Sequence, residues 1–249
     1  MRRRLPTRAG FAVWRDTTRL RIEERLQRPV RKSFLRLYHE RHLHPSNFVT
    51  GTEADRGRAS WLGVPTWKLP SDMWVYQEIL VETRPELVIE TGTQYGGSAL
   101  FYASVFDLLG AGEVVTIDID TASVHDAVRA HPRVTIIEGS STDPAVVRAV
   151  RERAAERRTM LILDSDHQQA HVAEELRVWS DVVSPGCYLV VEDTALGTEY
   201  LPGWGGSLAA LDEWLPAHGE FRRDPSREKF LVTVNPGGYL IRDQQPETR

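Results

Sequence analysis

Short apolar runs alternate with longer amphipathic stretches from residue 86 onward. Runs such as VVTID, VTIIE, LILD and YLVVED are continuously apolar and then end on an acidic residue. A continuously apolar run indicates a strand buried on both faces, which is typical of a parallel sheet covered by helices. The alternation therefore predicts a doubly wound α/β domain. We expect its strands at Leu87–Glu90, Glu113–Asp118, Arg133–Glu138, Met160–Asp164, Cys187–Asp193 and Phe230–Val234.

The stretches between these runs predict helices, because their apolar residues recur at helical spacing. Residues 73–84 show the same spacing before the first strand. Residues 1–45 predict one or two further amphipathic helices, with a break at Pro29 left open. The helices expected between strands cover Ser98–Leu109, Pro144–Arg157 and His167–Val183.

Two segments carry no clear period, residues 46–72 and residues 194–206. Long loops in a compact domain often serve as lids or binding loops, so we expect both segments to lie near a ligand. The chain therefore divides into residues 1–72, an N-terminal helical arm with a substrate-covering loop, and residues 73–249, the α/β domain.

Composition places the chain among globular proteins. Of its 249 residues 41% are hydrophobic and 27% are charged, which argues against disorder and collagen-like repeats. No apolar run approaches the roughly 20 residues needed to span a bilayer, and no apolar stretch of a signal peptide follows the basic start MRRRLPTRAG. Cys187 is the only cysteine, which excludes an internal disulfide and a cysteine metal cluster. We expect a cytoplasmic protein without membrane partners.

Charge is unevenly distributed along the chain. Residues 1–50 carry a balance of +9, and the remaining 199 residues carry −13. Such asymmetry can mark a nucleic-acid-binding arm, but acidic residues are interspersed in the basic segment. Arginine is also the general surface cation, with lysine only at Lys32, Lys68 and Lys229. We therefore expect no nucleic acid, and an arginine-rich arm that packs on the acidic body or on a second subunit of a homo-oligomer.

A glycine-rich turn follows the first expected strand, in the sequence VIETGTQYGGSAL. Gly92 allows a tight turn, while Gly96 and Gly97 allow the backbone to approach a ligand at a helix N-terminus. The dinucleotide fingerprint G-x-G-x-x-G does not fit, because glutamine replaces its second glycine. The pattern acid-x-Gly-x-x-x-Gly resembles instead the first motif of class I S-adenosylmethionine-dependent methyltransferases. In that family the strand-end carboxylate, here Glu90, and the glycine turn hold the amino-acid part of the cofactor.

Acidic and small residues end the next two strands. Asp118, in TIDID, is placed to accept both ribose hydroxyls of a nucleoside, with Asp120 as the second choice. Gly139 and Ser140, in EGSSTD, would border an adenine. We therefore expect a nucleoside cofactor across the carboxyl ends of the strands.

Three further carboxylates end two strands that we expect to be neighbours, namely Asp164 in LILDSDH and Glu192 and Asp193 in LVVEDT. Without a counter-ion such charges repel and raise one another's pKa. A divalent cation removes that conflict, and Mg²⁺ suits a few carboxylates together with waters or substrate oxygens. We predict a Mg²⁺ site there, with a solvated acidic rim as the alternative.

Two histidines follow Asp164. His167 lies at the rim of the expected metal site, where an imidazole can take a proton from a substrate hydroxyl. A helix-start histidine that only caps or packs is the alternative. His167 and His171 are also four residues apart, so on one helix face they would form a zinc or iron site.

These motifs, in this order, are similar to those of the cephalosporin hydroxylase and rhamnosyl O-methyltransferase family. The resemblance runs from Trp61 to Arg242 and is carried by MWVYQEIL, ETGTQYGGSALF, EVVTIDID, EGSSTDP, LDSDH, YLVVEDT and REKFLVTVNPGGYL. It implies a class I methyltransferase domain with a mostly parallel, seven-stranded Rossmann-like sheet and S-adenosylmethionine as cofactor. It also implies Mg²⁺, which several members bind. The residues that match the family's metal ligands and its proposed base are Asp164, Glu192, Asp193 and His167.

Two details of the expected site stay open. The extra acid Asp166 competes with Asp164 for the place of the first metal ligand. Asp164 is also expected among the residues that bind the cofactor.

We expect a Mg²⁺-assisted O-methyltransferase that moves a methyl group from S-adenosylmethionine to a hydroxyl of a sugar. The expected acceptor is a deoxysugar on a secondary metabolite, in a glycoside or polyketide-type molecule. His167 would act as the base, and Mg²⁺ would hold two adjacent acceptor oxygens. Tryptophans in or beside the two loops would stack on the acceptor or anchor the core. They are Trp61, Trp67, Trp74 and Trp204.

Two other functions stay open. Non-haem iron held by Asp164 or Asp166, with His167 and His171, would make the chain a hydroxylase of a secondary metabolite. The glycine turn and Asp118 would then have no role. A methyltransferase-like subunit that supports a partner enzyme is the second alternative, which the intact acidic residues and glycine turn disfavour.

Overall fold

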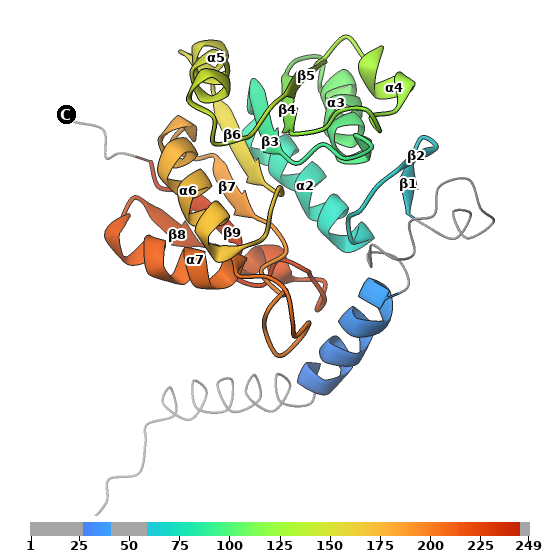
Figure 1. Ribbon diagram of the computed structural model, residues 1–249, viewed down its shortest axis with the longest axis vertical. Helices are drawn as coiled ribbons and strands as arrows, with labels where there is room; N and C mark the ends of the chain where they lie inside the picture. The colour runs from blue at the N-terminus through green and yellow to red at the C-terminus, as the bar shows by residue number, and fades with distance from the viewer. Residues whose placement is uncertain (1–26, 41–58, 245–249) are drawn as a thin grey trace, which may run out of the picture.

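A seven-stranded sheet lies at the centre of the computed structural model, which describes residues 27–40 and 59–244 (Figure 1). Its strand order is β5-β4-β3-β6-β7-β9-β8. All neighbouring strands from β5 to β7 pair in parallel, and β9 pairs antiparallel with both of its neighbours. The strands are β3 (Leu87–Thr91), β4 (Glu113–Asp118), β5 (Val134–Glu138), β6 (Thr159–Leu163), β7 (Tyr188–Val191), β8 (Phe221–Arg223) and β9 (Tyr239–Arg242).

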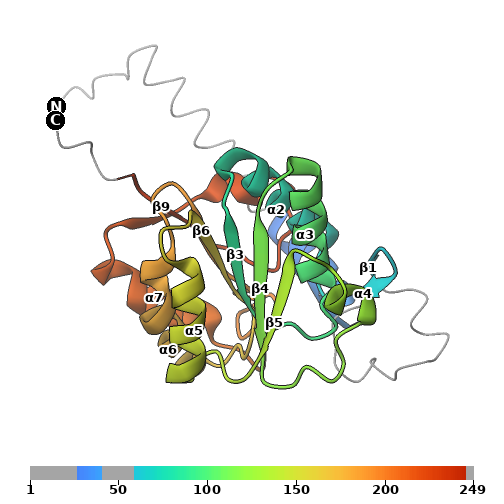
Figure 2. The same ribbon diagram turned by 90° about the horizontal axis from the view of Figure 1, so that it is seen from above.

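Helices cover both faces of the sheet. They are α2 (Pro70–Thr83), α3 (Gly97–Leu109), α4 (Asp126–Arg129), α5 (Pro144–Ala154), α6 (Gln169–Trp179) and α7 (Ser207–Trp214), with single turns η4 (Ser180–Val182), η5 (Leu215–Ala217) and η6 (Pro225–Glu228). Figure 2 shows α2 and α3 on one face and α5, α6 and α7 on the other. Successive strand residues alternate between two cores, since Val88 packs on the α2 and α3 side and Ile89 on the opposite side. The expected doubly wound, mostly parallel seven-stranded fold is confirmed.

The winding of the sheet reverses between β3 and β6. From β3 the chain moves outward through β4 to β5, returns with α5, and continues from β6 outward to β7. β3 and β6 pair in register, with Thr91 opposite Leu163. In an open α/β sheet, ligands bind beyond the carboxyl ends of the strands at such a switch point. The acidic ends of these strands therefore lie where a ligand is expected.

The apolar run at Phe230–Val234 is not a strand, so this prediction is wrong. The amide of Val234 donates to Asp72 Oδ2 (3.1 Å), and Ser71 Oγ donates to the carbonyl of Val232 (3.1 Å). Side chains at the start of α2 thus bond two of its backbone groups, and the amide of Ala195 donates to the carbonyl of Val234 (3.0 Å), so these groups are not paired with a strand. β8 and β9, which the sequence pattern missed, complete the sheet instead. The other five expected strands are present, each within two residues of its expected ends.

Several helix ends differ from those expected. α2 begins at Pro70, before residue 73, because proline suits the first helical turn. α6 begins only at Gln169, so His167 precedes it and shares no helix face with His171. The described part of the expected covering loop contains a short hairpin, β1 (Ser60–Trp61) and β2 (Val64–Pro65).

A helix at residues 27–38 lies beside the loop that follows β7 (Figure 1). Leu35 is buried in a cluster with Leu196 and Leu201 of that loop. The helix includes Pro29, where a break was one alternative. None of the described helices is long and apolar enough to cross a membrane.

Parts of two expectations lie outside the described residues. Residues 1–26 hold most of the basic arm, and residues 41–58 hold the first part of the expected covering loop. The described part of the covering loop, residues 59–69, contacts the site described below.

Leu161→Ala is expected to lower the free energy of unfolding by about 2–5 kcal/mol, because it leaves a cavity at a fully buried position of β6. Leu108→Ala is the matched control. Leu108 on α3 is 87% exposed, so its replacement should change the free energy by at most about 0.5 kcal/mol. Urea unfolding followed by circular dichroism measures both variants. Equal losses would contradict the placement of Leu161 in the core.

Candidate active site

The turn after β3 closes against the end of β6. Gly92 has φ 87°, in the left-handed region that favours glycine, and its amide donates to the carbonyl of Ile117 (2.8 Å). A Cβ at residue 92 would collide with the carbonyl oxygen of Asp164. The turn can approach β6 this closely only with glycine at this position, so the expected tight turn is present.

Gly96 and Gly97 face protein atoms. A Cβ on Gly96 would lie 2.7 Å from Cγ1 of Val128, and a Cβ on Gly97 would collide with Oγ1 of Thr66. Thr66 belongs to residues 59–69, which lead into α2. The space beside these glycines is therefore filled by two neighbouring segments. The approach of the backbone at Gly96 and Gly97 to a ligand stays a prediction.

Glu90 is fully buried near the end of β3. Its Oε2 accepts a hydrogen bond from Thr116 Oγ1 (2.8 Å), and the nearby Ser98 hydroxyl also lowers its pKa. Its Oε1 has no partner in hydrogen-bonding geometry among the described residues. Burial raises the pKa of Glu90 to about 7, and the Lys68 ammonium opposes this shift. A buried carboxylate oxygen without a partner is costly unless a ligand supplies the donor. Glu90 is thus suited to receive a ligand that carries N–H groups.

Asp118 ends β4 and ties it to the glycine turn. Its Oδ2 accepts from the amides of Thr93 and Gln94 (both 2.8 Å), and its Oδ1 accepts from the amide of Asp120 (3.1 Å). Backbone donors therefore use three of its roughly four lone-pair sites. Asp118 retains room for a further donor such as a ribose hydroxyl, and its contact with a ribose stays a prediction. Asp120, the second choice, is exposed at the same edge.

Gly139 and Ser140 follow β5 at the same edge of the sheet. The amide of Gly139 donates to the carbonyl of Asp118 (2.8 Å), and Ser140 Oγ lies 3.1 Å from Thr142 Oγ1 within the turn. The next residue, Ser141, is buried. The structure thus uses Ser140 in a local turn, and Ser141 is the serine that faces inward.

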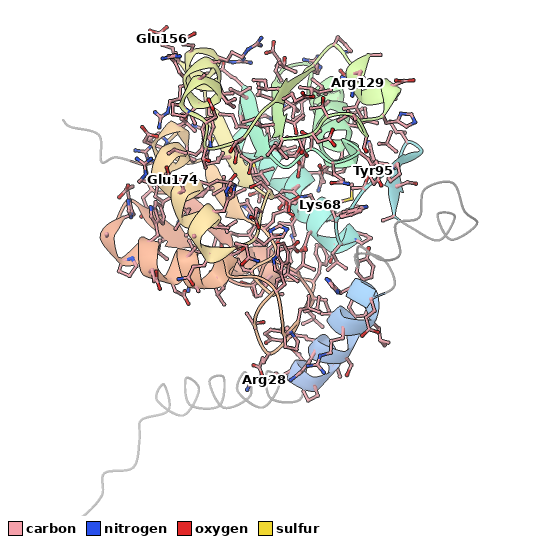
Figure 3. The ribbon with its side chains drawn as sticks, in the orientation of Figure 1. Arg28, Lys68, Tyr95, Arg129, Glu156 and Glu174 are labelled. Carbon is pink, nitrogen blue, oxygen red and sulfur yellow. The ribbon has the colours of Figure 1, made fainter. Side chains whose placement is uncertain are left out.

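Asp164 and Glu192 follow neighbouring strands, as expected. β6 and β7 pair in parallel with Leu163 opposite Val191, so the acidic residues that come next meet at one edge. Both carboxylates converge on Lys68, which Figure 3 shows in the interior near the start of α2. Its Nζ contacts Asp164 Oδ2 and lies 2.6 Å from Glu192 Oε2. The carboxylates therefore have a buried counter-ion, which corrects the expectation that they lack one.

Burial raises the pKa of every carboxyl group in this cluster. The pKa of Glu192 rises to about 7 by burial, with the Asp164 carboxylate adding to the shift and Lys68 opposing it. Burial is also the main cause of the raised pKa values of Asp164 and Asp193. Burial alone would lower the pKa of Lys68, but Asp164 and Glu192 raise it above its ordinary value. Lys68 therefore stays charged at neutral pH.

His167 and Asp193 lie on the other side of Asp164. Asp193 has φ 54°, and its amide donates to Asn235 Oδ1 (2.8 Å), so the chain turns sharply after β7. His167 Nε2 lies 3.2 Å from Asp193 Oδ2 and 4.0 Å from Asp164 Oδ1. One potential ligand atom from each of these three residues lies within 4.8 Å of the others. This group of described side chains has the donors and the spacing to hold a metal ion.

Glu192 was expected in that group, but its carboxylate is engaged on both oxygens. Oε2 contacts Lys68, and Oε1 accepts a hydrogen bond from the Tyr76 hydroxyl (2.5 Å). The group that could hold a metal thus contains His167 beside Asp164 and Asp193, in the place expected for Glu192. Glu192 remains adjacent, since it shares Lys68 with Asp164.

His171 does not join His167. Its Nε2 lies 3.1 Å from Ser165 Oγ and 3.6 Å from Glu175 Oε1, within a separate polar cluster at the start of α6. Asp166 is exposed and accepts from a backbone amide at that helix start. The zinc or iron set with two histidines is therefore not assembled, and Asp164 is the acid that the structure places in the metal group.

The tryptophans divide between core and site. Trp61 packs on α3 and donates a hydrogen bond to it, Trp67 lies against the glycine turn, and Trp74 is exposed on α2. Trp204 belongs to the loop after β7 and is 56% exposed. Its ring meets that of His167 edge to face, with centroids 5.3 Å apart. Trp204 is thus the tryptophan placed to contact a ligand at His167.

Known proteins match most of the chain. A model of the family described as Rhamnosyl O-methyltransferase/CmcI matches residues 56–243. The chain belongs to this family. The rhamnosyl O-methyltransferase of Mycobacterium tuberculosis (strain ATCC 25618 / H37Rv) is 39% identical over 195 residues, covering 75% of this chain and 79% of that protein. The rhamnosyl O-methyltransferase of Mycobacterium leprae is 38% identical over 205 residues, covering 79% and 86%.

Solved structures of this family share the fold. An apo structure of CmcI-N160 has a TM-score of 0.60 at 21% identity, covering 78% of this chain and 79% of that chain. A structure of CmcI-D160 with Mg and SAM has a TM-score of 0.58 at 20% identity and the same coverage. The family predicted from the sequence is confirmed, and with it the enzyme class, an O-methyltransferase.

Sequence reasoning missed the side chains that hold the acidic residues in place, namely Lys68, Tyr76 and Asn235. A signal existed for Lys68, because it is one of only three lysines in an arginine-rich chain. Asn235 lies 42 residues after the amide that it accepts from, and no local pattern points to that contact. Its role follows only from the packed structure of this O-methyltransferase.

Gly92→Ala is expected to lower the free energy of unfolding by more than the roughly 1–2 kcal/mol of left-handed strain alone, because the new Cβ also collides with β6. Gly110→Ala supplies the matched control. Gly110 has φ 79° but open space around its Cα, so this variant measures the strain by itself. Urea unfolding of both proteins separates the two effects. Equal destabilisation would contradict the close packing of the glycine turn on β6.

Proposed function

We propose that this O-methyltransferase moves a methyl group from S-adenosylmethionine to a sugar hydroxyl, with Mg²⁺ at the acidic strand ends and His167 as the base. The observation that carries the proposal is the convergence of Asp164, His167 and Asp193 at the switch point of the sheet, beside the glycine turn. In the proposal the two carboxylates hold the ion, and His167 stays free to take the proton. A metal ion and a proton acceptor beside a cofactor site are suited to activating a hydroxyl group.

The end of β3 fits the amino-acid part of S-adenosylmethionine. Glu90 Oε1 is buried and lacks a donor among the described residues, and the cofactor's ammonium group supplies one. The bare Cα of Gly92 lets the turn pack closely beside it. Asp118 and Ser140, at the ends of β4 and β5, would border the nucleoside, together with the backbone of Gly139. The cofactor supplies a methyl group made electrophilic by the sulfonium centre.

The donor set fits a hard cation. Asp164 and Asp193 offer carboxylate oxygens, and Glu192 lies beside them as a third carboxylate. Mg²⁺ held there would bind oxygens of the acceptor and increase the acidity of its hydroxyl group. A solved CmcI structure of the same fold contains Mg and SAM together, which supports this pairing of cofactors.

His167 is placed to remove the acceptor proton. Its Nε2 lies 3.2 Å from Asp193 Oδ2, and a carboxylate beside an imidazole stabilises the positive charge that the ring gains on accepting a proton. S-adenosylmethionine would supply the methyl group, and the His167 ring would take up the proton that the acceptor hydroxyl loses. Holding the acceptor oxygen in line with the methyl group is the larger contribution to the rate.

The acceptor that we propose is a deoxysugar hydroxyl of a glycoside. The mycobacterial relatives are named for a rhamnosyl acceptor, and they match more than three quarters of their own length with this chain. Trp204 offers an exposed ring beside His167, and the C–H face of a sugar packs well on such a ring. We further propose that this sugar is attached to a secondary metabolite.

His167→Gln is expected to lower kcat for methyl transfer to a rhamnoside by about 10²–10⁴-fold, because the general base is lost. Affinity for S-adenosylmethionine, measured by calorimetry, should stay unchanged. His218→Gln, which alters a histidine stacked on Trp214 away from the site, is the control.

Transfer of a labelled methyl group measures the rates, with and without a chelator. The wild type should lose activity in chelator and regain it with Mg²⁺. Full activity of His167→Gln would rule out His167 as the base. Methyl transfer by the wild type that persists in chelator would rule out a role of the metal in the reaction.

Affinity for S-adenosylmethionine is expected to fall as the pH drops below about 7. Burial raises the pKa of Glu90 to about 7, so at lower pH its carboxyl group is protonated and attracts the cofactor's ammonium group less. Calorimetry at about one pH unit below and above this value measures the change. Glu90→Gln should bind weakly at both, whereas Glu86→Gln, at the opposite end of β3, should behave like the wild type. A pH-independent wild type would contradict this role.

A further inference from the structure

Lys68 is a buried lysine that the proposed reaction does not itself use. Its side chain is 3% exposed, and its Nζ contacts Asp164 Oδ2 and lies 2.6 Å from Glu192 Oε2. It stands between β2 and α2, in the interior of the molecule (Figure 3). Burial of an ammonium group is unfavourable unless nearby carboxylates compensate its charge. Asp164 and Glu192 supply that compensation.

Lys68 is held by Asp164, which belongs to the proposed metal group, and by Glu192, which lies beside that group. Asp164 directs Oδ2 to Lys68, while its Oδ1 lies 4.0 Å from His167 Nε2. Glu192 directs Oε2 to Lys68 and Oε1 to the Tyr76 hydroxyl. An ion that binds Asp164 Oδ2 or Glu192 Oε2 must move the ammonium group away, because two cations on one oxygen repel each other.

We propose that Lys68 is a positioning residue that acts as an internal counter-ion for Asp164 and Glu192 and yields their oxygens when Mg²⁺ binds. This inference rests on the metal site of the proposed function. Without the ion, Lys68 holds the two carboxylates together. With the ion, its charge still offsets part of the negative charge of the site. The affinity for Mg²⁺ is therefore lower than the carboxylates alone would give.

The proposed exchange of Lys68 for Mg²⁺ would also affect residues 59–69, the segment that carries Lys68. Thr66, two residues before Lys68, packs against Gly97 at the start of α3. The carbonyl of Lys68 accepts a hydrogen bond from the Tyr38 hydroxyl (3.3 Å) of the helix at residues 27–38. A shift of the Lys68 side chain therefore acts on a segment that contacts both the glycine turn and the N-terminal helix.

The wild-type protein offers a direct readout, because Lys68 is one of only three lysines. Protein labelled with ¹³C at lysine Cε gives NMR signals that Lys32→Arg and Lys229→Arg assign. Mg²⁺ is expected to shift the Lys68 signal and to leave that of Lys229, which pairs with Glu78 (2.5 Å), unchanged. A Lys68 signal that does not move at a Mg²⁺ concentration that saturates the protein in calorimetry overturns the exchange.

Lys68→Met removes the ammonium group at similar side-chain length. We expect this variant to bind Mg²⁺ at least about tenfold more tightly in calorimetry, because the ion no longer competes with an internal cation. Lys68→Arg keeps the charge and should bind close to wild-type affinity. Lys229→Met, at an exposed ion pair, is the matched control and should leave the affinity unchanged.

The outcomes separate the two proposals. The Lys68→Met variant could lose the same stability with and without Mg²⁺ and keep the wild-type affinity for the ion. That result would assign Lys68 a merely structural role and overturn the exchange. If this variant does not fold, the NMR titration of the wild type decides. A wild type that binds no Mg²⁺ overturns both the metal site and the exchange. Mg²⁺ binding with an unmoved Lys68 signal overturns the exchange alone.

Discussion

The ion pairs of Lys68 with Asp164 and Glu192 stabilise the acidic edge of the sheet. A doubly wound sheet collects the carboxyl ends of its strands at one edge, and in this chain that edge is acidic, with Glu90 and Glu192 buried. Removal of one partner from a buried ion pair costs about 3–5 kcal/mol, because the remaining charge is uncompensated. The surrounding side chains reduce this cost, since Tyr76 donates to Glu192 and Asn235 accepts from the amide of Asp193.

Irregular segments bring these partners together. Residues 59–69 carry Lys68, the loop after β7 carries Trp204, and residues 230–238 carry Asn235. Their backbones are held by the regular elements, as where Asp72 at the start of α2 accepts from the amide of Val234. Asp72 is buried and also accepts a hydrogen bond from the Tyr239 hydroxyl (3.1 Å), and its burial raises its pKa to about 7. The site is thus built on loops whose positions a rigid sheet and one helix start determine.

The strands and the acidic strand ends could be predicted because each is a local pattern, an apolar run that ends on a carboxylate. The run at Phe230–Val234 is equally apolar but is followed by Asn235 instead of a carboxylate, and side chains of α2 bond two of its backbone groups. Nothing local in the sequence reveals those contacts. The prediction that His167 and His171 share a helix face was wrong because α6 begins only at Gln169. Lys68 lies 96 residues before Asp164, in a segment without periodicity, so only the packed structure shows their contact.

The proposed function holds that a divalent cation and the cofactor meet at the switch point of the sheet. Anomalous diffraction from crystals grown with Mn²⁺ and S-adenosylhomocysteine tests this most directly. The account predicts one anomalous peak bounded by Asp164 and Asp193, cofactor density beside Glu90, and the Lys68 ammonium group withdrawn from Asp164. An empty acidic edge under saturating Mn²⁺, or a peak at His171 instead, would contradict it.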